Sequence, residues 1–119
     1  MNFIIQDGFD IKKGKDLDYQ KWLAENEEKL AASCPTGIEY LGTFANIFGS
    51  EQNVRAYRTL WGMDSYGALD GFSEAIKEGG TFGQLMDTKG GFELDRQDGG
   101  LTSSELSRRV TDAAIWGVD

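Results

Sequence analysis

The chain has 119 residues, the usual size of one domain, and its single cysteine, Cys34, rules out a disulfide within the chain. The net charge of −8 and the pI of about 4.5 disfavour nucleic acids and anionic membranes as partners, because an acidic surface repels phosphate groups. The absence of histidine excludes Ser–His and Cys–His catalytic pairs, histidine-held haem, and zinc or non-haem iron sites built on histidine.

The first predicted elements are a strand, a loop and a helix. We expect a short strand over residues 2–6, then a loop of glycines and charged residues. Asp16 begins a helix, because Asp16 and Asp18 suit a cap or a first turn, and Pro35 and Gly37 end it. The stripe at helical spacing is Tyr19, Trp22, Leu23, Asn26 and Leu30.

Two strands, 37–48 and 54–63, are predicted to form an antiparallel hairpin around the turn 49–53, with a bulge at Gly42. Alternation along the second strand sorts its residues onto two faces. One face holds Val54, Ala56, Arg58, Leu60 and Gly62, and the other holds Arg55, Tyr57, Thr59, Trp61 and Met63. Both faces carry apolar side chains, so both have to be covered.

A second helix follows, capped by Asp64 or Ser65 and ended by Gly79 and Gly80. Its two internal glycines, Gly67 and Gly71, weaken the helix and suit close packing. Thr81 and Gln84 have capping-box spacing, which indicates a further short helix.

The remaining residues are predicted as a loop over about 89–102, a helical turn near 103–107 and a last strand over about 110–117. The loop is rich in glycine and aspartate, but it lacks the alternating ligand order of a calcium loop. We therefore expect no metal site, and the whole chain, residues 1–119, is predicted to form a single domain.

This order of elements, βαββαβ, is the ferredoxin-like pattern of the α+β class, an antiparallel sheet with helices on one face. The bare face then has two possible covers. A second copy of the sheet can pair with it in a homodimer, or the short helix or the long loop can fold over it. We favour the homodimer, because a loop of glycine and aspartate is poor covering material.

The hairpin strand ending "TLWGMD" leads directly into the helix "SYGALDGFSEAI". This arrangement resembles the dimeric α/β-barrel superfamily, which includes antibiotic-biosynthesis monooxygenase-like, EthD-like and NIPSNAP-like families. Trp61 and Asp64–Ser65 carry the likeness, and the pattern extends over most of residues 2–88. The resemblance implies that two sheets pair into a dimeric α/β barrel, with a cleft between the sheet and the helices of each subunit.

The resemblance also implies a mostly apolar pocket for a small apolar or aromatic ligand. The candidate pocket residues are Trp22, Tyr40, Phe44, Asn46, Tyr57, Arg58 and Trp61. Arg58 interrupts an apolar face, so pointing inward it would hold a carboxylate or an enolate. Its other interpretation, which we favour, is a strand arginine whose head reaches solvent or pairs with an acidic residue.

Two functions are consistent with these observations. The first is a homodimeric module with a small-molecule or structural role and no assigned reaction. The alternative is a cofactor-independent monooxygenase-like enzyme that acts on a small aromatic or hydroxylated metabolite. No catalytic residue is assigned and no cofactor is expected, and Cys34, which lacks a basic partner, is interpreted as a packing residue. The chain shows no membrane-length apolar run and no signal peptide, so we expect a cytoplasmic protein.

Overall fold

The computed structural model describes residues 2–49, 55–95, 97, 99–100 and 102–111. Its elements follow in the order β1 (Phe3–Phe9), α1 (Asp16–Ala32), β2 (Ile38–Ala45), β3 (Tyr57–Met63), α2 (Ala68–Lys77), α3 (Thr81–Phe92) and β4 (Ser103–Arg108). The predicted α+β class and the ferredoxin-like order of elements are confirmed, with α3 as the additional helix.

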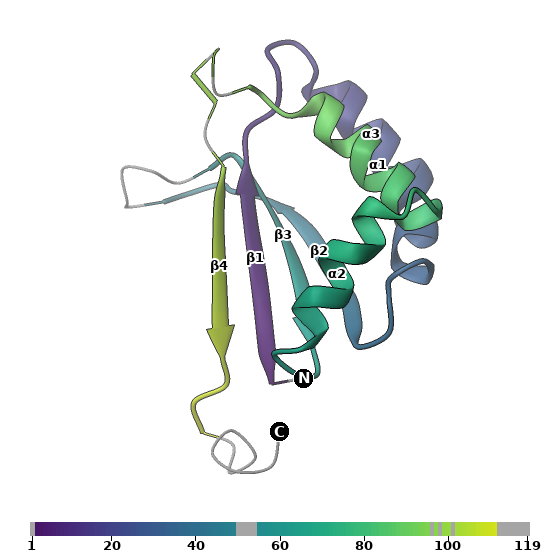
Figure 1. The fold of residues 1–119 in the computed structure, drawn as a ribbon. Helices are drawn as coiled ribbons and strands as arrows, with labels where there is room; N and C mark the ends of the chain where they lie inside the picture. Colours follow the sequence, from purple (N-terminus) through teal and green to yellow (C-terminus); the bar gives the residue numbers. More distant parts are fainter. Residues whose placement is uncertain (1, 50–54, 96, 98, 101, 112–119) are drawn as a thin grey trace.

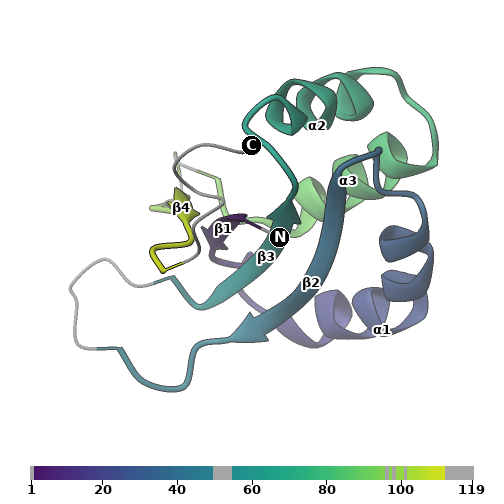
Figure 2. The ribbon, with the colours of Figure 1, turned by 90° about the horizontal axis from the view of Figure 1, so that it is seen from below.

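The four strands form one antiparallel sheet in the order β2-β3-β1-β4. All three helices lie on one side of this sheet, so that the molecule has two layers (Figure 1). Seen from below, the sheet curves around the helices, and no described helix lies against its other face (Figure 2). The expected one-sided coverage is therefore present. None of the described helices is both long enough and apolar enough to cross a bilayer.

The hairpin of β2 and β3 forms as predicted, and its register shifts between Tyr40 and Gly42. Gly42 has a φ of 137°, a backbone conformation that residues with a side chain rarely adopt. The ring of Phe44 lies directly over this glycine, because a Cβ built on Gly42 would be 3.2 Å from two of its ring carbons. The predicted bulge is confirmed, while part of the predicted turn, residues 50–54, lies outside the described residues.

β1 extends further than the predicted strand at 2–6, which was wrong at its C-terminal end. Asp7, Gly8 and Phe9 stay in the sheet because they pair with β3 on one side, and Asp7 and Gly8 also pair with β4 on the other. A Cβ on Gly8 would be 2.5 Å from the Ser103 hydroxyl oxygen. The glycine that indicated a loop thus allows a close approach inside a strand.

α2 begins at Ala68, so the expected cap at Asp64 or Ser65 is wrong. The helix has no side-chain cap; a backbone amide bond from Ala68 to the Ser65 carbonyl leads into it. Two more bonds of the same i→i−3 type follow. A tight turn after β3 therefore satisfies amides that a capping side chain would otherwise bond.

The close helix contact is made by a glycine that the sequence did not single out. A Cβ on Gly71 would have no neighbour within 4 Å, and one on Gly67 would touch only the Ser65 hydroxyl at 3.9 Å. A Cβ on Gly83 of α3 would lie 2.7 Å from the Ile76 carbonyl oxygen of α2. The close-packing role expected of Gly67 and Gly71 therefore belongs to Gly83.

The C-terminal predictions need correction. α3 extends to Phe92, so the start of the expected loop at 89–102 is helical. The expected helical turn at 103–107 is instead the strand β4. β1 has a free edge at this point, and Leu106 pairs with Ile5 there, so sheet pairing overrides the weak helical spacing. Of the expected strand at 110–117, residues 110–111 are not in a strand, and 112–117 lie outside the described residues.

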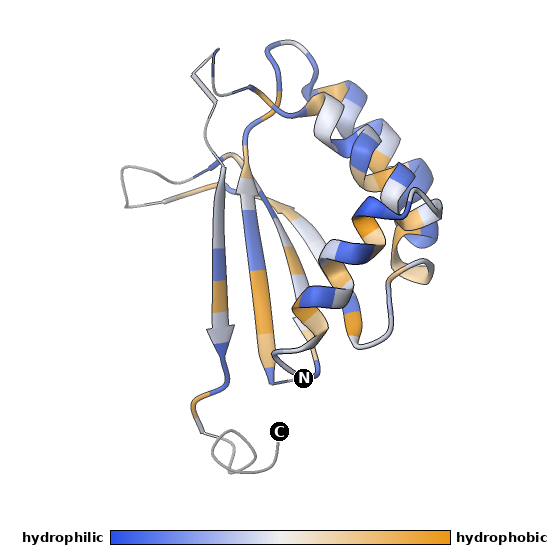
Figure 3. Cartoon of the chain, viewed as in Figure 1, coloured by the Kyte–Doolittle hydropathy of each residue, from blue (hydrophilic) through white to orange (hydrophobic). Residues whose placement is uncertain are grey.

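The core consists of two clusters of buried side chains between the sheet and the helices. The larger cluster, around Trp61 and Met63, lies under all three helices, and the smaller, around Tyr19 and Tyr57, lies near the start of α1. A hydrophilic band interrupts the hydrophobic colour of β1 between them (Figure 3). Asp7 of β1, which lies between the two clusters, belongs to the candidate functional site.

Candidate functional site

A row of polar side chains crosses the helix-facing side of the sheet. Register pairs Thr43 of β2 with Thr59 of β3, Thr59 with Asp7 of β1, and Asp7 with Ser104 of β4. Directly paired residues point to the same face of a sheet, so these four, hereafter the polar row, lie side by side. The alternation that buries Phe3, Ile5 and Phe9 thus also brings Asp7 to the interior.

Hydrogen bonds link the β2 and β3 part of the polar row to α1. The Tyr40 hydroxyl donates to Glu27 Oε2 at 2.6 Å and lies 2.7 Å from Thr43 Oγ1. Thr43 Oγ1 in turn lies 3.0 Å from Thr59 Oγ1, and Thr59 is 1% exposed. Buried hydroxyls need such partners, because an unpaired polar group inside a protein costs about 1–3 kcal/mol.

The other end of the polar row opens into a cleft between β1, β4 and the C-terminal half of α3. Its volume is about 380 Å³, near the lower end of the range for ligand pockets, roughly 300–1,000 Å³. The cleft is lined by Asp7, Gly8, Phe9, Met86, Lys89, Glu93, Thr102, Ser103 and Ser104. It combines hydroxyls, an acid–base group of three charged side chains and two apolar walls, a mixture that suits a small polar molecule.

Lys89 is the most buried charged residue of this cleft, at 6% exposure. Its Nζ lies 2.8 Å from Glu93 Oε2 and 3.7 Å from the centre of the Phe9 ring. The ion pair and the ring face replace the water that this ammonium loses on burial. Lys89 is therefore held in place over the mouth of the polar row, with its charge balanced by Glu93.

Asp7 lies at the inner wall of the cleft, where the Ser104 hydroxyl donates to its Oδ1 at 3.0 Å. Burial raises the pKa of Asp7 above its usual value of 3.8, and the Ser104 hydroxyl, the Lys89 ammonium and the Trp61 indole oppose that shift. A carboxyl with a raised pKa in a cleft is a typical proton donor or acceptor.

Two buried polar atoms of the described residues have no hydrogen-bond partner, namely the Tyr19 hydroxyl and Trp61 Nε1. Both residues are 0% exposed. The Tyr19 hydroxyl lies near Thr43 and the Trp61 indole near Asp7, but neither contact has hydrogen-bond geometry. Two donors thus flank the polar row with no acceptor, which is costly unless something else in the interior accepts from them.

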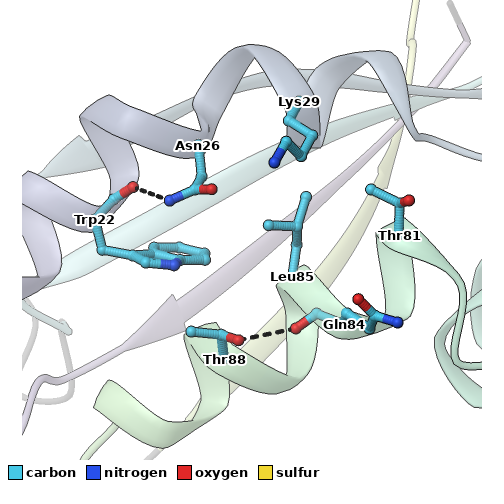
Figure 4. A pocket seen from close by; sticks show the side chains of 7 residues that line it. All are labelled: Trp22, Asn26, Lys29, Thr81, Gln84, Leu85 and Thr88. Carbon is cyan, nitrogen blue, oxygen red and sulfur yellow. Dashed lines mark hydrogen bonds between the residues drawn. The ribbon is translucent and has the colours of Figure 1, made fainter.

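A second hollow, of about 510 Å³, lies between α1 and α3 (Figure 4). It is lined by Trp22, Asn26, Lys29, Thr81, Gln84, Leu85 and Thr88. Two of its polar groups bond within their own helices, because Asn26 donates to the Trp22 carbonyl at 2.8 Å and Thr88 to the Gln84 carbonyl at 3.0 Å. With those groups engaged and only one charged side chain, this hollow fits a polar ligand less well than the Asp7 cleft.

The structure distributes the seven candidate pocket residues over three places. Tyr40, Tyr57 and Trp61 face the helices, and Trp22 lines the hollow between α1 and α3. Phe44 and Arg58 pair across β2 and β3 on the open face of the sheet, where Arg58 donates to Gln6 Oε1 at 3.1 Å. Asn46 lies beside the hairpin and donates to the Arg55 carbonyl at 3.4 Å. No single described pocket unites them, and their role in binding stays a prediction.

Sequence reasoning missed Asp7, Lys89, Glu93 and Ser104, which define the cleft. A signal was present for Asp7, because Phe3, Ile5, Asp7 and Phe9 alternate and so share a face if the strand continues past Gln6. Lys89 sits in a Gly-rich stretch, and Ser104 in a polar one, so neither carried a comparable signal.

No group of three or more His, Cys, Asp or Glu side chains able to hold a metal ion occurs within the described part of the chain. Burial raises the pKa of the Cys34 thiol, whose Sγ lies 3.5 Å from the Leu30 carbonyl. A thiol with a raised pKa is a poor nucleophile, which agrees with a packing role.

No protein-family model matches the sequence, and no curated protein matches it. Solved structures do match the fold. A NIPSNAP domain protein from Burkholderia xenovorans, described as uncharacterized, aligns with a TM-score of 0.65 at 10% identity over 92% of this chain and 95% of its own. A dimeric ferredoxin-like protein of unknown function from Thermobifida fusca aligns with a TM-score of 0.58 at 10% identity, over 92% of each chain.

An antibiotic biosynthesis monooxygenase also aligns, with a TM-score of 0.56 at 17% identity, over 92% of this chain and 99% of its own. Identities this low establish a shared fold and nothing further about chemistry. The resemblance expected from the strand ending in Trp61 is confirmed at that level: the chain has the fold shared by NIPSNAP and antibiotic-monooxygenase-like proteins.

Proposed function

We propose that the protein binds a small hydroxylated molecule in the cleft lined by Asp7, Lys89 and Ser104. The observation that carries this proposal is a cleft of ligand size whose wall holds a carboxyl with a raised pKa, placed between the hydroxyls of Thr59 and Ser104. Ser103 and Thr102 add hydroxyls at the rim, where they would bond to a polyol or a phenol.

Charge narrows the ligand class. When all three are ionised, Asp7, Lys89 and Glu93 sum to one negative charge, and Lys89 is already paired. With Asp7 protonated the sum is zero, so in neither state would an anionic ligand find a net positive charge or an unpaired cation in the trio. We therefore favour an uncharged molecule, while cofactor-independent oxidation stays a prediction of the resemblance.

The binding test compares two carboxylate replacements. Wild type, Asp7→Ala and Asp87→Ala are screened by melting temperature against a panel of small polyols and phenols. Asp87 is exposed on α3 and does not line the cleft, so it is the matched control. A ligand at a hundred times its Kd should stabilise the wild type by about 2.7 kcal/mol. Stabilisation that is lost in Asp7→Ala and kept in Asp87→Ala supports the site, and equal stabilisation of all three places binding elsewhere.

We also propose that two copies pair through the open face of the sheet. Phe44 is 52% exposed there, and Ile4 and Leu60 are half-buried on the same face. A helix-free sheet face with exposed aromatic and aliphatic side chains is typical of an interface. A structural neighbour is described as dimeric, which agrees with this arrangement.

The dimer is tested by sedimentation of wild type, Phe44→Glu and Leu17→Glu. Leu17 is 79% exposed on α1, on the helix side, so its variant adds the same charge away from the sheet. We expect Phe44→Glu to sediment as a monomer and Leu17→Glu to sediment like the wild type. A monomeric wild type at micromolar concentration would refute the pairing without affecting the cleft.

A further inference from the structure

A chain of hydroxyls, half-buried at Tyr40 and Thr43 and buried at Thr59, leads from the surface of α1 toward Asp7. Its links are the contacts from Glu27 to Tyr40 at 2.6 Å, from Tyr40 to Thr43 at 2.7 Å and from Thr43 to Thr59 at 3.0 Å. Thr59 is the direct cross-strand partner of Asp7. Such partners have Cβ atoms about 4.5–5.5 Å apart, a gap that a carboxyl group spans directly or through one water.

The direction of these hydrogen bonds follows from counting protons. Tyr40 has one hydroxyl proton, and it donates that proton to Glu27. The contact between Tyr40 and Thr43 must then be donated by Thr43, and the contact between Thr43 and Thr59 by Thr59. The Thr59 oxygen is therefore left with lone pairs to offer on the side of Asp7.

We propose that Tyr40, Thr43 and Thr59 are positioning residues for Asp7. Their hydroxyls, all oriented toward Glu27, present an acceptor oxygen to Asp7 and so favour the form of Asp7 that carries a proton. In that form Oδ2 donates toward Thr59, while Oδ1 accepts from the Ser104 hydroxyl and faces the ligand. The inference deepens the proposed function, on which it rests for the presence of a ligand: the cleft offers its ligand a neutral carboxyl group.

The charged groups around Asp7 agree with this arrangement. From α3 and the residue that follows it come Lys89 and Glu93, which pair with each other, and from β4 comes the uncharged Ser104. β3 contributes Thr59 and the Trp61 indole; the indole and the Lys89 ammonium lower the pKa of Asp7 and Glu93 raises it, but burial has the largest effect. Burial raises the pKa of Asp7, in the direction that an acceptor at Thr59 also requires.

The test is a titration of the Asp7 carboxyl carbon by NMR in the ligand-free protein. Tyr40→Phe removes one uncharged hydroxyl, two strands away from Asp7. Without it, Thr43 and Thr59 are free to turn, and Thr59 donates to the ionised Asp7 instead of accepting from the neutral form. We expect the pKa of Asp7 to fall by about half a unit to one unit, the scale of one neutral hydrogen bond.

Three further variants make the result specific. Thr43→Val removes the central hydroxyl of the hydrogen-bond chain and should lower the pKa of Asp7 in the same way. Thr43→Ser keeps that hydroxyl and should leave the pKa of Asp7 at its wild-type value. Tyr57→Phe is the matched control, because the Tyr57 hydroxyl also lies on the helix side but accepts from Gln20 at 3.0 Å, outside the chain. It should leave the pKa of Asp7 unchanged.

The proposal is overturned if Tyr40→Phe and Thr43→Val leave the pKa of Asp7 where Tyr57→Phe leaves it, or raise it. Amide spectra of each variant verify the fold, and Thr43→Val with Thr43→Ser decides the question if Tyr40→Phe does not fold. Because no ligand is present, a failure here leaves the binding proposal standing. Loss of binding in the screen would equally leave this titration valid.

Discussion

The two faces of the sheet come from the same alternation of residues, yet they differ in what they contact. On the helix side, Trp61 and Met63 are 0% exposed and pack under three helices. On the open side, Phe44 is 52% exposed, and Arg58 pairs with Gln6. Burial therefore depends on which layer a strand faces, since apolar side chains are present on both sides.

The comparison also shows that the buried face is the one that carries the interior polar chemistry. The polar row divides the helix side into two apolar clusters and ends in the Asp7 cleft. Polar groups in such surroundings have strong effects on one another, because less water screens them. The proposed binding site therefore lies on the helix side, and the proposed contact with a second copy lies on the open side.

The largest expected difference between the two faces is in stability. Trp61→Ala removes a fully buried ring and should lower the free energy of unfolding by about 3–5 kcal/mol. Phe44→Ala on the open face should cost about 1 kcal/mol or less under conditions where the protein is monomeric. Urea unfolding measures both, and similar losses would show that the open face is also part of a packed core.

The helix layer can be tested at one backbone contact. Gly83→Ala would place a Cβ 2.7 Å from the Ile76 carbonyl oxygen. Because α2 and α3 would have to move apart, we expect the free energy of unfolding to fall by about 1–3 kcal/mol. A Cβ on Gly71 would have no neighbour within 4 Å. Gly71→Ala, inside α2, should therefore raise the free energy of unfolding by about 0.5–1 kcal/mol. Thermal unfolding of the two variants should thus give shifts of opposite sign.

The polar row predicts that the stability of the fold depends on pH, with an effect smaller than those of the substitutions above. The folded state raises the pKa of Asp7, so it binds this proton more tightly than the unfolded chain. The stabilisation of the fold by protonated Asp7 is complete below its usual pKa of 3.8, and it is lost as the pH rises through the pKa of Asp7 in the folded protein. Asp7→Asn should therefore melt above the wild type at pH 7, and this advantage should disappear near pH 3.

A melting temperature that is lower in Asp7→Asn at pH 7 would mean that the ionised carboxylate, held by Ser104 and Lys89, stabilises the fold. Asp87→Asn is the control, because Asp87 is exposed, and its melting temperature relative to the wild type should change little over the same pH range.

The smallest expected effect concerns Cys34. Burial raises the pKa of its thiol, so less thiolate is present at pH 7.4 than for a free thiol. Its alkylation in the folded protein should be slower than that of glutathione, and urea should remove the difference. Alkylation as fast as glutathione in the folded protein would mean that the α1–β2 corner opens readily.

The sequence by itself determined the order of elements from β1 to α3, the hairpin with its bulge at Gly42, and the one-sided sheet, because alternation, helical spacing and glycine act locally. It also determined that both faces of β3 carry apolar side chains. It did not determine β4, because six polar residues become a strand only when β1 offers them an edge.

Only the tertiary structure decided the site. Thr43, Thr59, Asp7 and Ser104 are far apart in the chain, and strand register brings them into one row. Lys89 reaches that row because α3 brings its Nζ over the Phe9 ring of β1. Such long-range pairings leave no periodic trace in a single sequence, and for that reason the Asp7 cleft became visible only in the folded chain.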